Sequence, residues 1–198
     1  MIPLRGYLLD TNIITYWFDH DDPRHAQVLG HIGALLPDTP LRISSVTLGE
    51  IEYGLRADPR TDTALRAGLT AFVKEELPPA LDVRNTTAIY YGPLRARLFD
   101  KFPPKKRRRK GLRPEQLTDP ITAKELGIQE NDLWLAAQAI EHRLVFVTHD
   151  KMDHIRQVLD GELALDIEDW ADKADALVKA ITTFAATAKS GSQATPPA

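Results

Sequence analysis

The chain has 198 residues and a mass of 22.1 kDa, the usual size of a single domain. Hydrophobic residues make up 43% and charged residues 27%, as in a globular protein and unlike a disordered one. Cysteine is absent, which excludes a disulfide scaffold, a cysteine-ligated metal centre and a thiol nucleophile. The sequence shows neither a signal-peptide core nor an apolar run of about 18 residues, so we expect a cytoplasmic protein with no membrane span.

Charge is unevenly distributed along the chain. The formal net charge is −3, from 25 Lys and Arg against 28 Asp and Glu. Eight of the cations lie between Lys101 and Arg113, where no acid occurs. The rest of the chain is therefore strongly acidic, which is not the pattern of a generic basic nucleic-acid-binding protein. Bound metal cations would account for the excess of acids.

Short apolar runs that alternate with helical patterns predict an α/β fold. The first strand is expected at residues 6–10, where Asp10 can cap the helix that follows. Further strands are expected at residues 41–43, 81–83, 144–147 and 163–167. Amphipathic helices are expected at residues 23–36, 45–56, 61–76, 86–100 and 131–142. This alternation predicts a parallel sheet with right-handed crossovers.

Two segments fall outside that pattern. Residues 101–120 are rich in cations and proline and have almost no apolar periodicity, so they predict a loop or disordered insertion. A helical pattern resumes at Ile121. Residues 171–198 are Ala-rich and then polar, which predicts a tail that is partly helical and then disordered. The expected organisation is one domain over residues 1–170 followed by this tail.

Four acids are candidates for a site, although each also fits a plainer role. Asp10 and Asp150 directly follow predicted strands, at the sheet edge where α/β proteins bind ligands, but they also fit as cap or turn residues. Glu50 lies near the apolar side of its helix, where a carboxylate needs a partner, a proton or a metal; otherwise it is a surface acid. Asp132 is favoured by the dipole of its helix, and Asn131 beside it offers a neutral oxygen.

Convergence of these four acids would have a chemical consequence. Carboxylates gathered at one sheet edge repel one another unless cations lie between them. Ligand sets made only of oxygen select hard ions such as Mg²⁺ or Mn²⁺. Two such ions can activate a water molecule and stabilise the leaving oxygen of a phosphodiester.

Four stretches, in this order, resemble the PIN-domain nucleases and are most similar to the VapC ribonuclease toxins of bacterial toxin–antitoxin pairs. They are LLDTN at residues 8–12, SSVTLGEIEYGL at 44–55, NDLWLAA at 131–137 and LVFVTHD at 144–150. The resemblance covers about residues 5–170. It implies a PIN-like three-layer sandwich with a central parallel sheet flanked by helices.

The resemblance also implies an activity, a cofactor and partners. It implies an endoribonuclease that depends on Mg²⁺ (or Mn²⁺), cleaves an RNA substrate, forms a homodimer and is held by a cognate antitoxin protein. The catalytic and metal-binding quartet falls on Asp10, Glu50, Asp132 and Asp150. Supporting roles fall on Thr11, Asn12, Thr148 and Asp153.

Some readings stay open. The protein is either a nuclease or a catalytically silent or housekeeping PIN-fold protein that binds RNA or scaffolds a complex. The basic run, Lys105, Lys106, Arg107, Arg108, Arg109 and Lys110, is either a solvated loop or an arm that binds the RNA backbone. His149 is either a half-exposed loop residue or a contact to a substrate phosphate. The insertion and the tail have no recognised counterpart in the family.

Overall fold

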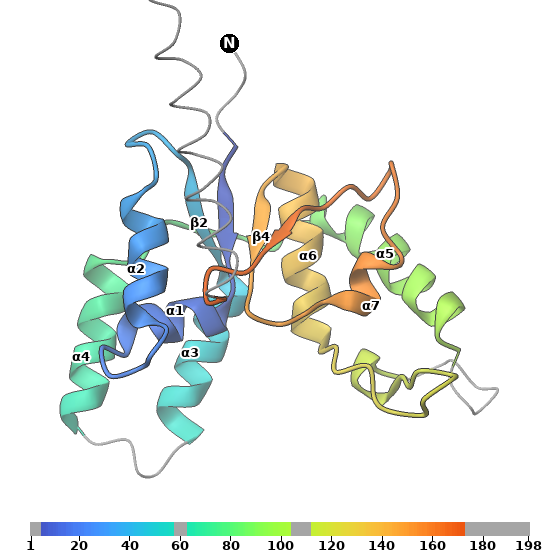
Figure 1. The fold of residues 1–198 in the computed structure, drawn as a ribbon, viewed down its shortest axis with the longest axis horizontal. Helices are drawn as coiled ribbons and strands as arrows, with labels where there is room; N and C mark the ends of the chain where they lie inside the picture. Colours follow the sequence, from blue (N-terminus) through green and yellow to red (C-terminus); the bar gives the residue numbers. More distant parts are fainter. Residues whose placement is uncertain (1–4, 58–62, 104–111, 173–198) are drawn as a thin grey trace, which may run out of the picture.

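A computed structural model describes residues 5–57, 63–103 and 112–172 (Figure 1). Within these ranges the strands form one parallel sheet in the order β3-β2-β1-β4-β5. The strands are β1 Tyr7–Leu9, β2 Leu41–Ser44, β3 Ala80–Leu81, β4 Val145–Val147 and β5 Ile167–Glu168. The helices are α1 Thr11–Phe18, α2 His25–Gly33, α3 Ser45–Ala57, α4 Thr63–Glu75, α5 Thr87–Lys101, α6 Glu130–His142 and α7 Asp153–Arg156, with a 3₁₀ helix at Pro114–Gln116.

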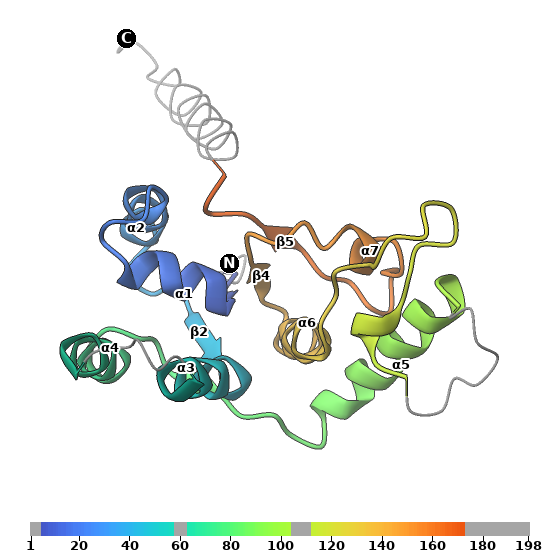
Figure 2. The ribbon, with the colours of Figure 1, turned by 90° about the horizontal axis from the view of Figure 1, so that it is seen from below.

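The sheet is covered on both faces, which confirms the predicted α/β fold. Figure 2 shows α1 and α2 on one face and α5 and α6 on the other. Successive strand residues point to opposite faces: Leu8 and Phe146 pack in the core with α5 and α6, whereas Leu9 and Val147 pack in the core with α1. Strands buried on both faces are apolar throughout, which is why their sequences show no alternation.

The helical pattern predicted from Ile121 is wrong, whereas the last predicted strand is present at the sheet edge with different bounds. Residues 120–122 form a turn, Glu125 forms an isolated β-bridge with Thr118, and α6 begins only at Glu130. Asp119 accepts hydrogen bonds from the backbone N–H groups of Ile121 and Thr122, which fixes a turn where a helix would start. The last strand spans Ile167–Glu168 and so overlaps the predicted range, residues 163–167, only at its end; Leu163 packs into the core from the loop before it. The third strand is likewise shorter than predicted.

The predicted insertion is partly ordered. After the basic run, the chain forms the 3₁₀ helix, and Leu117 is fully buried against α5 and α6. The basic run at residues 105–110 and the tail from residue 173 onward lie outside the described residues, so the predictions for them stand untested. No helix in the described ranges is long and apolar enough to cross a membrane.

Candidate active site

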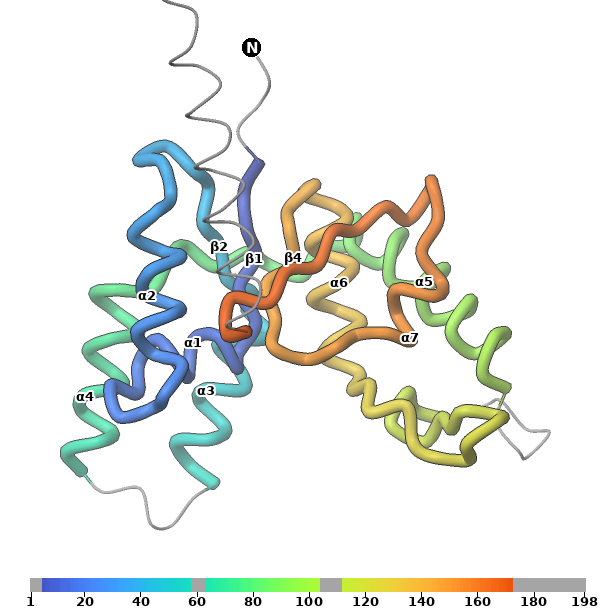
Figure 3. Tube along the Cα trace, in the orientation of Figure 1, coloured from blue at the N-terminus to red at the C-terminus, as the bar shows by residue number. Residues whose placement is uncertain are grey.

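The predicted acids gather where the strand order reverses. From β1 the sheet extends to β2 and β3 on one side and to β4 and β5 on the other, so β1 and β4 flank the switch point (Figure 3). Asp10 follows β1, and its backbone N–H donates to the carbonyl of Val147 at 2.9 Å. Thr148 follows β4 directly. The two strand ends therefore present their side chains at the same edge.

Asp10 is both a helix cap and a member of the site. Its side chain is 5% exposed. Oδ1 accepts a hydrogen bond from the backbone N–H of Thr11 at 2.7 Å, as an N-cap of α1 does. Oδ2 accepts from the Thr148 hydroxyl at 2.6 Å and from Asn12 Nδ2 at 3.0 Å. The structure thus unites the two roles that the sequence left as alternatives.

Asn12 and Thr148 hold Asp150 beside Asp10. Asn12 Nδ2 lies 3.1 Å from Asp150 Oδ2, and its Oδ1 accepts from the backbone N–H of His149 at 3.1 Å. The Thr148 hydroxyl accepts from the backbone N–H of Asp150 at 3.1 Å. Asp150 itself is exposed. Asn12 and Thr148 therefore lie where supporting residues were predicted.

Glu50 enters the site from α3, held by donors from two other helices. The Thr11 hydroxyl donates to its Oε2, and Asn131 Nδ2 donates to its Oε1 at 2.6 Å. Thr11 therefore also lies at a supporting position. Asn131, expected to offer an oxygen, instead presents its amide nitrogen to Glu50.

Asp132 occupies the first turn of α6. Its Oδ2 accepts from the backbone N–H of Gln129 at 2.7 Å, so it closes a capping box at the start of the helix. The pKa of Asp132 is raised to about 7, mainly by burial and in smaller part by the charges of Asp10, Asp150 and Glu50.

The pKa of Asp10 is raised by the same two causes as that of Asp132, burial and neighbouring acids. This pKa is raised to about 6, mainly by burial and in smaller part by nearby Asp150 and Glu50, against the lowering effect of the hydrogen bonds from Thr148 and Thr11. The four predicted acids thus influence one another electrostatically. Asp153 is not among the groups that shift these pKa values, and it lies exposed in the first turn of α7.

His149 has a partner that the sequence did not indicate. Its Nδ1 lies 2.9 Å from Asp169 Oδ2, and its ring packs edge-on against Tyr16. Asp169 follows β5 at the same edge of the sheet. Asp169 was not singled out from the sequence, although it follows the predicted last strand within two residues.

The donor set has the chemistry of a hard-cation site. All four side chains offer carboxylate oxygen, and burial and the neighbouring acids penalise the ionised forms of Asp10 and Asp132, a penalty that a cation would relieve. In the described ranges no group of three or more acid or histidine side chains is already arranged to hold a metal ion. The four side chains therefore suit a hard cation in their donor atoms and their charge. Binding would require the carboxylates to move toward one another.

Fold and site together define an α/β protein with an acidic site at the switch point of its parallel sheet. The chain belongs to the PIN-domain family, whose profile matches residues 7–158. Comparison with curated protein sequences finds no match.

Several solved structures share this fold. VapBC2 from Rickettsia felis, solved bound to a DNA fragment from its promoter, is 23% identical with a TM-score of 0.58, over 83% of this chain and 98% of that one. VapBC-1 from nontypeable Haemophilus influenzae is 23% identical with a TM-score of 0.56, over 84% and 98%. FitAcB from Neisseria gonorrhoeae is 15% identical with a TM-score of 0.56, over 83% and 97%. At these identities the similarity shows the fold alone.

Proposed function

We propose that this protein is a metal-dependent endoribonuclease and the toxin of a toxin–antitoxin pair. The observation that carries the proposal is the gathering of Asp10, Glu50, Asp132 and Asp150 at the switch point, with the pKa values of Asp10 and Asp132 raised by burial and by the neighbouring acids. Keeping four carboxylates together, with Asp10 buried and the pKa of Asp132 also raised, is costly, and a hydrolytic metal centre is a function that needs such a group.

The four acids would hold one or two Mg²⁺ or Mn²⁺ ions. When bound, the metal supplies a water molecule of lowered pKa and a positive charge opposite the phosphodiester oxygens. Thr11 and Asn131 fix both oxygens of Glu50, and Asn12 fixes the spacing of Asp10 and Asp150. Such prior orientation lowers the cost of assembling the site.

The partner proposal rests on the structural relatives. The matched chains belong to the structures of VapBC2, VapBC-1 and FitAcB, and this chain covers 97–98% of their length. From the resemblance in sequence to the VapC toxins we infer that the present protein is bound by an antitoxin and that it forms a homodimer. The resemblance in sequence gives hydrolysis to a 5′-phosphate and a 3′-hydroxyl as the expected outcome.

The proposal is tested by incubating the purified protein with single-stranded RNA and Mn²⁺. We expect internal cleavage that EDTA abolishes and that added Mn²⁺ restores. Asp132→Asn, purified in parallel, should cleave at most about 1% as fast, and it controls for a contaminating ribonuclease. If the wild type binds RNA but leaves it intact in Mn²⁺, the protein is instead a silent PIN-fold RNA-binding or scaffold protein.

A further inference from the structure

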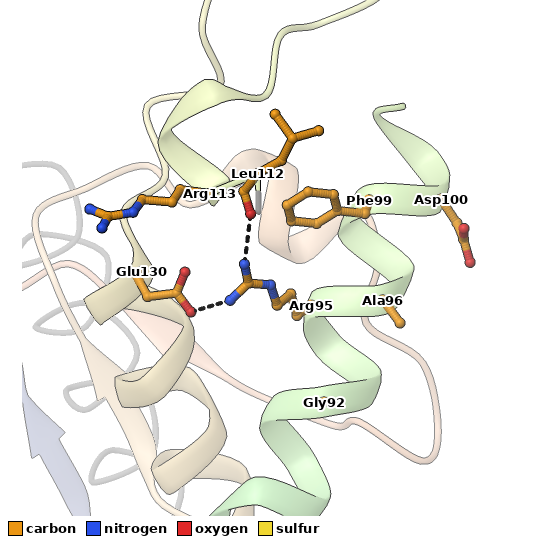
Figure 4. Close-up of a pocket in the computed structure, with 8 residues that line it drawn as sticks. All are labelled: Gly92, Arg95, Ala96, Phe99, Asp100, Leu112, Arg113 and Glu130. Carbon is orange, nitrogen blue, oxygen red and sulfur yellow. Dashed lines mark hydrogen bonds and ion pairs between the residues drawn. The ribbon is translucent and has the colours of Figure 1, made fainter. Parts of the chain in front are cut away.

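Arg95, in the middle of α5, connects three segments of the chain. Its Nη1 forms an ion pair with Glu130 Oε1 at 2.5 Å, and its Nη2 donates to the carbonyl of Leu112 at 2.8 Å (Figure 4). Nη1 also donates to the Tyr91 hydroxyl. The side chains of Arg95 and Glu130 are 31% and 29% exposed, so water screens this pair less than it screens a surface pair.

The segment after the basic run completes this contact. Glu115, in the 3₁₀ helix, accepts a hydrogen bond from the backbone N–H of Glu130 at 2.8 Å. That N–H is one of the donors that the first turn of an α-helix leaves unpaired, and a carboxylate there is favoured by the helix dipole. Arg95 therefore holds the side chain of Glu130 while Glu115 holds its backbone.

Glu130 and the site lie on different sides of the same helical turn. Two residues along an α-helix correspond to a rotation of about 200°, so Glu130 faces α5 while Asp132 faces the other acids. Between them, Asn131 donates to Glu50 at 2.6 Å. A shift or loosening of this turn would displace both Asn131 and Asp132 from the site.

We propose that Arg95 is a positioning residue for the acidic site. Its ion pair with Glu130 and its hydrogen bond to Leu112 fix the first turn of α6. That turn sets the positions of Asn131 and Asp132 relative to Glu50. The inference rests on the proposed function, and it assigns part of the predicted insertion a role in organising that site.

Arg97 on the same helix provides a matched control. It forms ion pairs with Asp160 at 2.6 Å and with Glu162 at 3.0 Å, so it is also an α5 arginine between two acceptors. Its partners lie in the loop that follows α7, away from the first turn of α6. Loss of Arg97 therefore removes similar interactions without releasing that turn.

The test compares Arg95→Met and Arg97→Met with the wild type by three measurements: RNA cleavage in Mn²⁺, Mn²⁺ affinity by electron paramagnetic resonance, and hydrogen exchange. For Arg95→Met we expect kcat to fall about 10- to 100-fold with KM within about twofold, because a displaced turn misplaces reacting groups. Mn²⁺ affinity should also fall, and exchange at residues 129–133 should accelerate. Arg97→Met should match the wild type in all three.

Two further variants keep the proposal falsifiable if Arg95→Met folds poorly. Arg95→Lys should recover part of the loss, because an ammonium group can meet Glu130 but cannot bridge to Leu112 as the planar guanidinium does. Glu130→Gln keeps an acceptor and should show a smaller loss in the same direction. Equal values for Arg95→Met and Arg97→Met in all three measurements would overturn the proposal. A wild type that cleaves no RNA would overturn the proposed function, while Mn²⁺ affinity and exchange would still decide the role of Arg95.

Discussion

Asn131 donates a hydrogen bond through Nδ2 to Glu50 Oε1 at 2.6 Å, and this contact joins α6 to α3 across the acidic site. The other oxygen of Glu50 accepts from the Thr11 hydroxyl of α1. Each carboxylate oxygen has two lone pairs, so both oxygens keep acceptor capacity for a cation. Through this hydrogen bond Asn131 is placed to orient Glu50 as a ligand.

Removing this donor should impair turnover more than folding. For Asn131→Ala we expect kcat to fall about 10-fold or more, since a hydrogen bond to a charged group contributes about 1.5–3 kcal/mol. KM for RNA should change little. Asn85→Ala, at an exposed position before α5, serves as the control. Steady-state cleavage kinetics at saturating Mn²⁺ decide the matter, and wild-type kcat in Asn131→Ala would contradict the assigned role.

Asp132→Asn is the sharpest single change for the acidic quartet. The Asn oxygen can still accept from the backbone N–H of Gln129, so the start of α6 should stay intact while the charge is lost. Asp10→Asn is less clean, because both oxygens of Asp10 accept hydrogen bonds and an amide nitrogen would face a donor. We expect Asp132→Asn to retain the circular dichroism spectrum of the wild type and to lose RNA cleavage by at least about 100-fold. An active variant would remove Asp132 from the proposed metal ligands.

The same variant should be more stable than the wild type without metal, in a pH-dependent way. Because the pKa of Asp132 is about 7 in the folded protein and about 3.9 in an unfolded chain, the folded state binds the proton more tightly. The stabilisation that protonated Asp132 gives the folded wild type is complete below about pH 4 and is lost as the pH rises through about 7. In EDTA the variant should therefore exceed the wild type by a few kcal/mol at pH 8 and by much less at pH 5. Urea unfolding at both values measures this, and a difference independent of pH would contradict the assigned electrostatics.

Much of the fold was predictable, because a buried parallel strand appears in the sequence as a short, continuous apolar run. The apolar run before Asp10 and the one before Thr148 each locate a strand and the end that carries a site residue. The segment from Ile121 was not predictable, since its turns depend on Asp119 and on a left-handed Gly127, with φ of 68°, which override its helical pattern. The short final strand is defined by pairing with β4 and not by its own sequence.

The acids of the candidate site could be predicted from the sequence, but the long-range contacts that hold them in position could not. The position of Asp10 after a strand and of Asp132 in a helical first turn could be read from the chain. The contact of Arg95 with Glu130 could not, because 35 residues separate them and neither belongs to a motif. Such long-range ion pairs arise from the packing of α5 against α6, which local patterns do not encode.

A toxin should arrest growth when it is produced without its antitoxin. We expect induction of the wild-type chain in a bacterial host to stop growth within about one generation, and induction of Asp150→Asn or Asp132→Asn to leave growth unchanged. Colony counts and optical density measure the effect, and immunoblotting must show equal soluble protein. Normal growth with abundant soluble wild type would favour a housekeeping or scaffolding PIN-domain protein.

The basic run offers a separate prediction about substrate binding. The acidic site and the acidic remainder of the chain repel RNA phosphates, and Lys105, Lys106, Arg107, Arg108, Arg109 and Lys110 would offset this by binding the backbone away from the cut. Single-strand binding weakens with salt by a slope of about −0.7 per phosphate neutralised, so four or five contacts give a slope near about −3. Replacing all six residues by Ser should flatten that slope and raise KM several-fold, with kcat little changed because the contacts are remote from the chemistry.

A variant with Arg107, Arg108 and Arg109 changed to Lys preserves the charge and controls for the change of sequence. Its salt slope should equal that of the wild type, because counterion release depends on the number of charges and not on the fork of the guanidinium. Mn²⁺ affinity should be the same in all three proteins, since the run supplies no metal ligand. A six-Ser variant with the wild-type slope would mean that these cations do not touch RNA, and their role would then be sought in solubility or in shielding the acidic site.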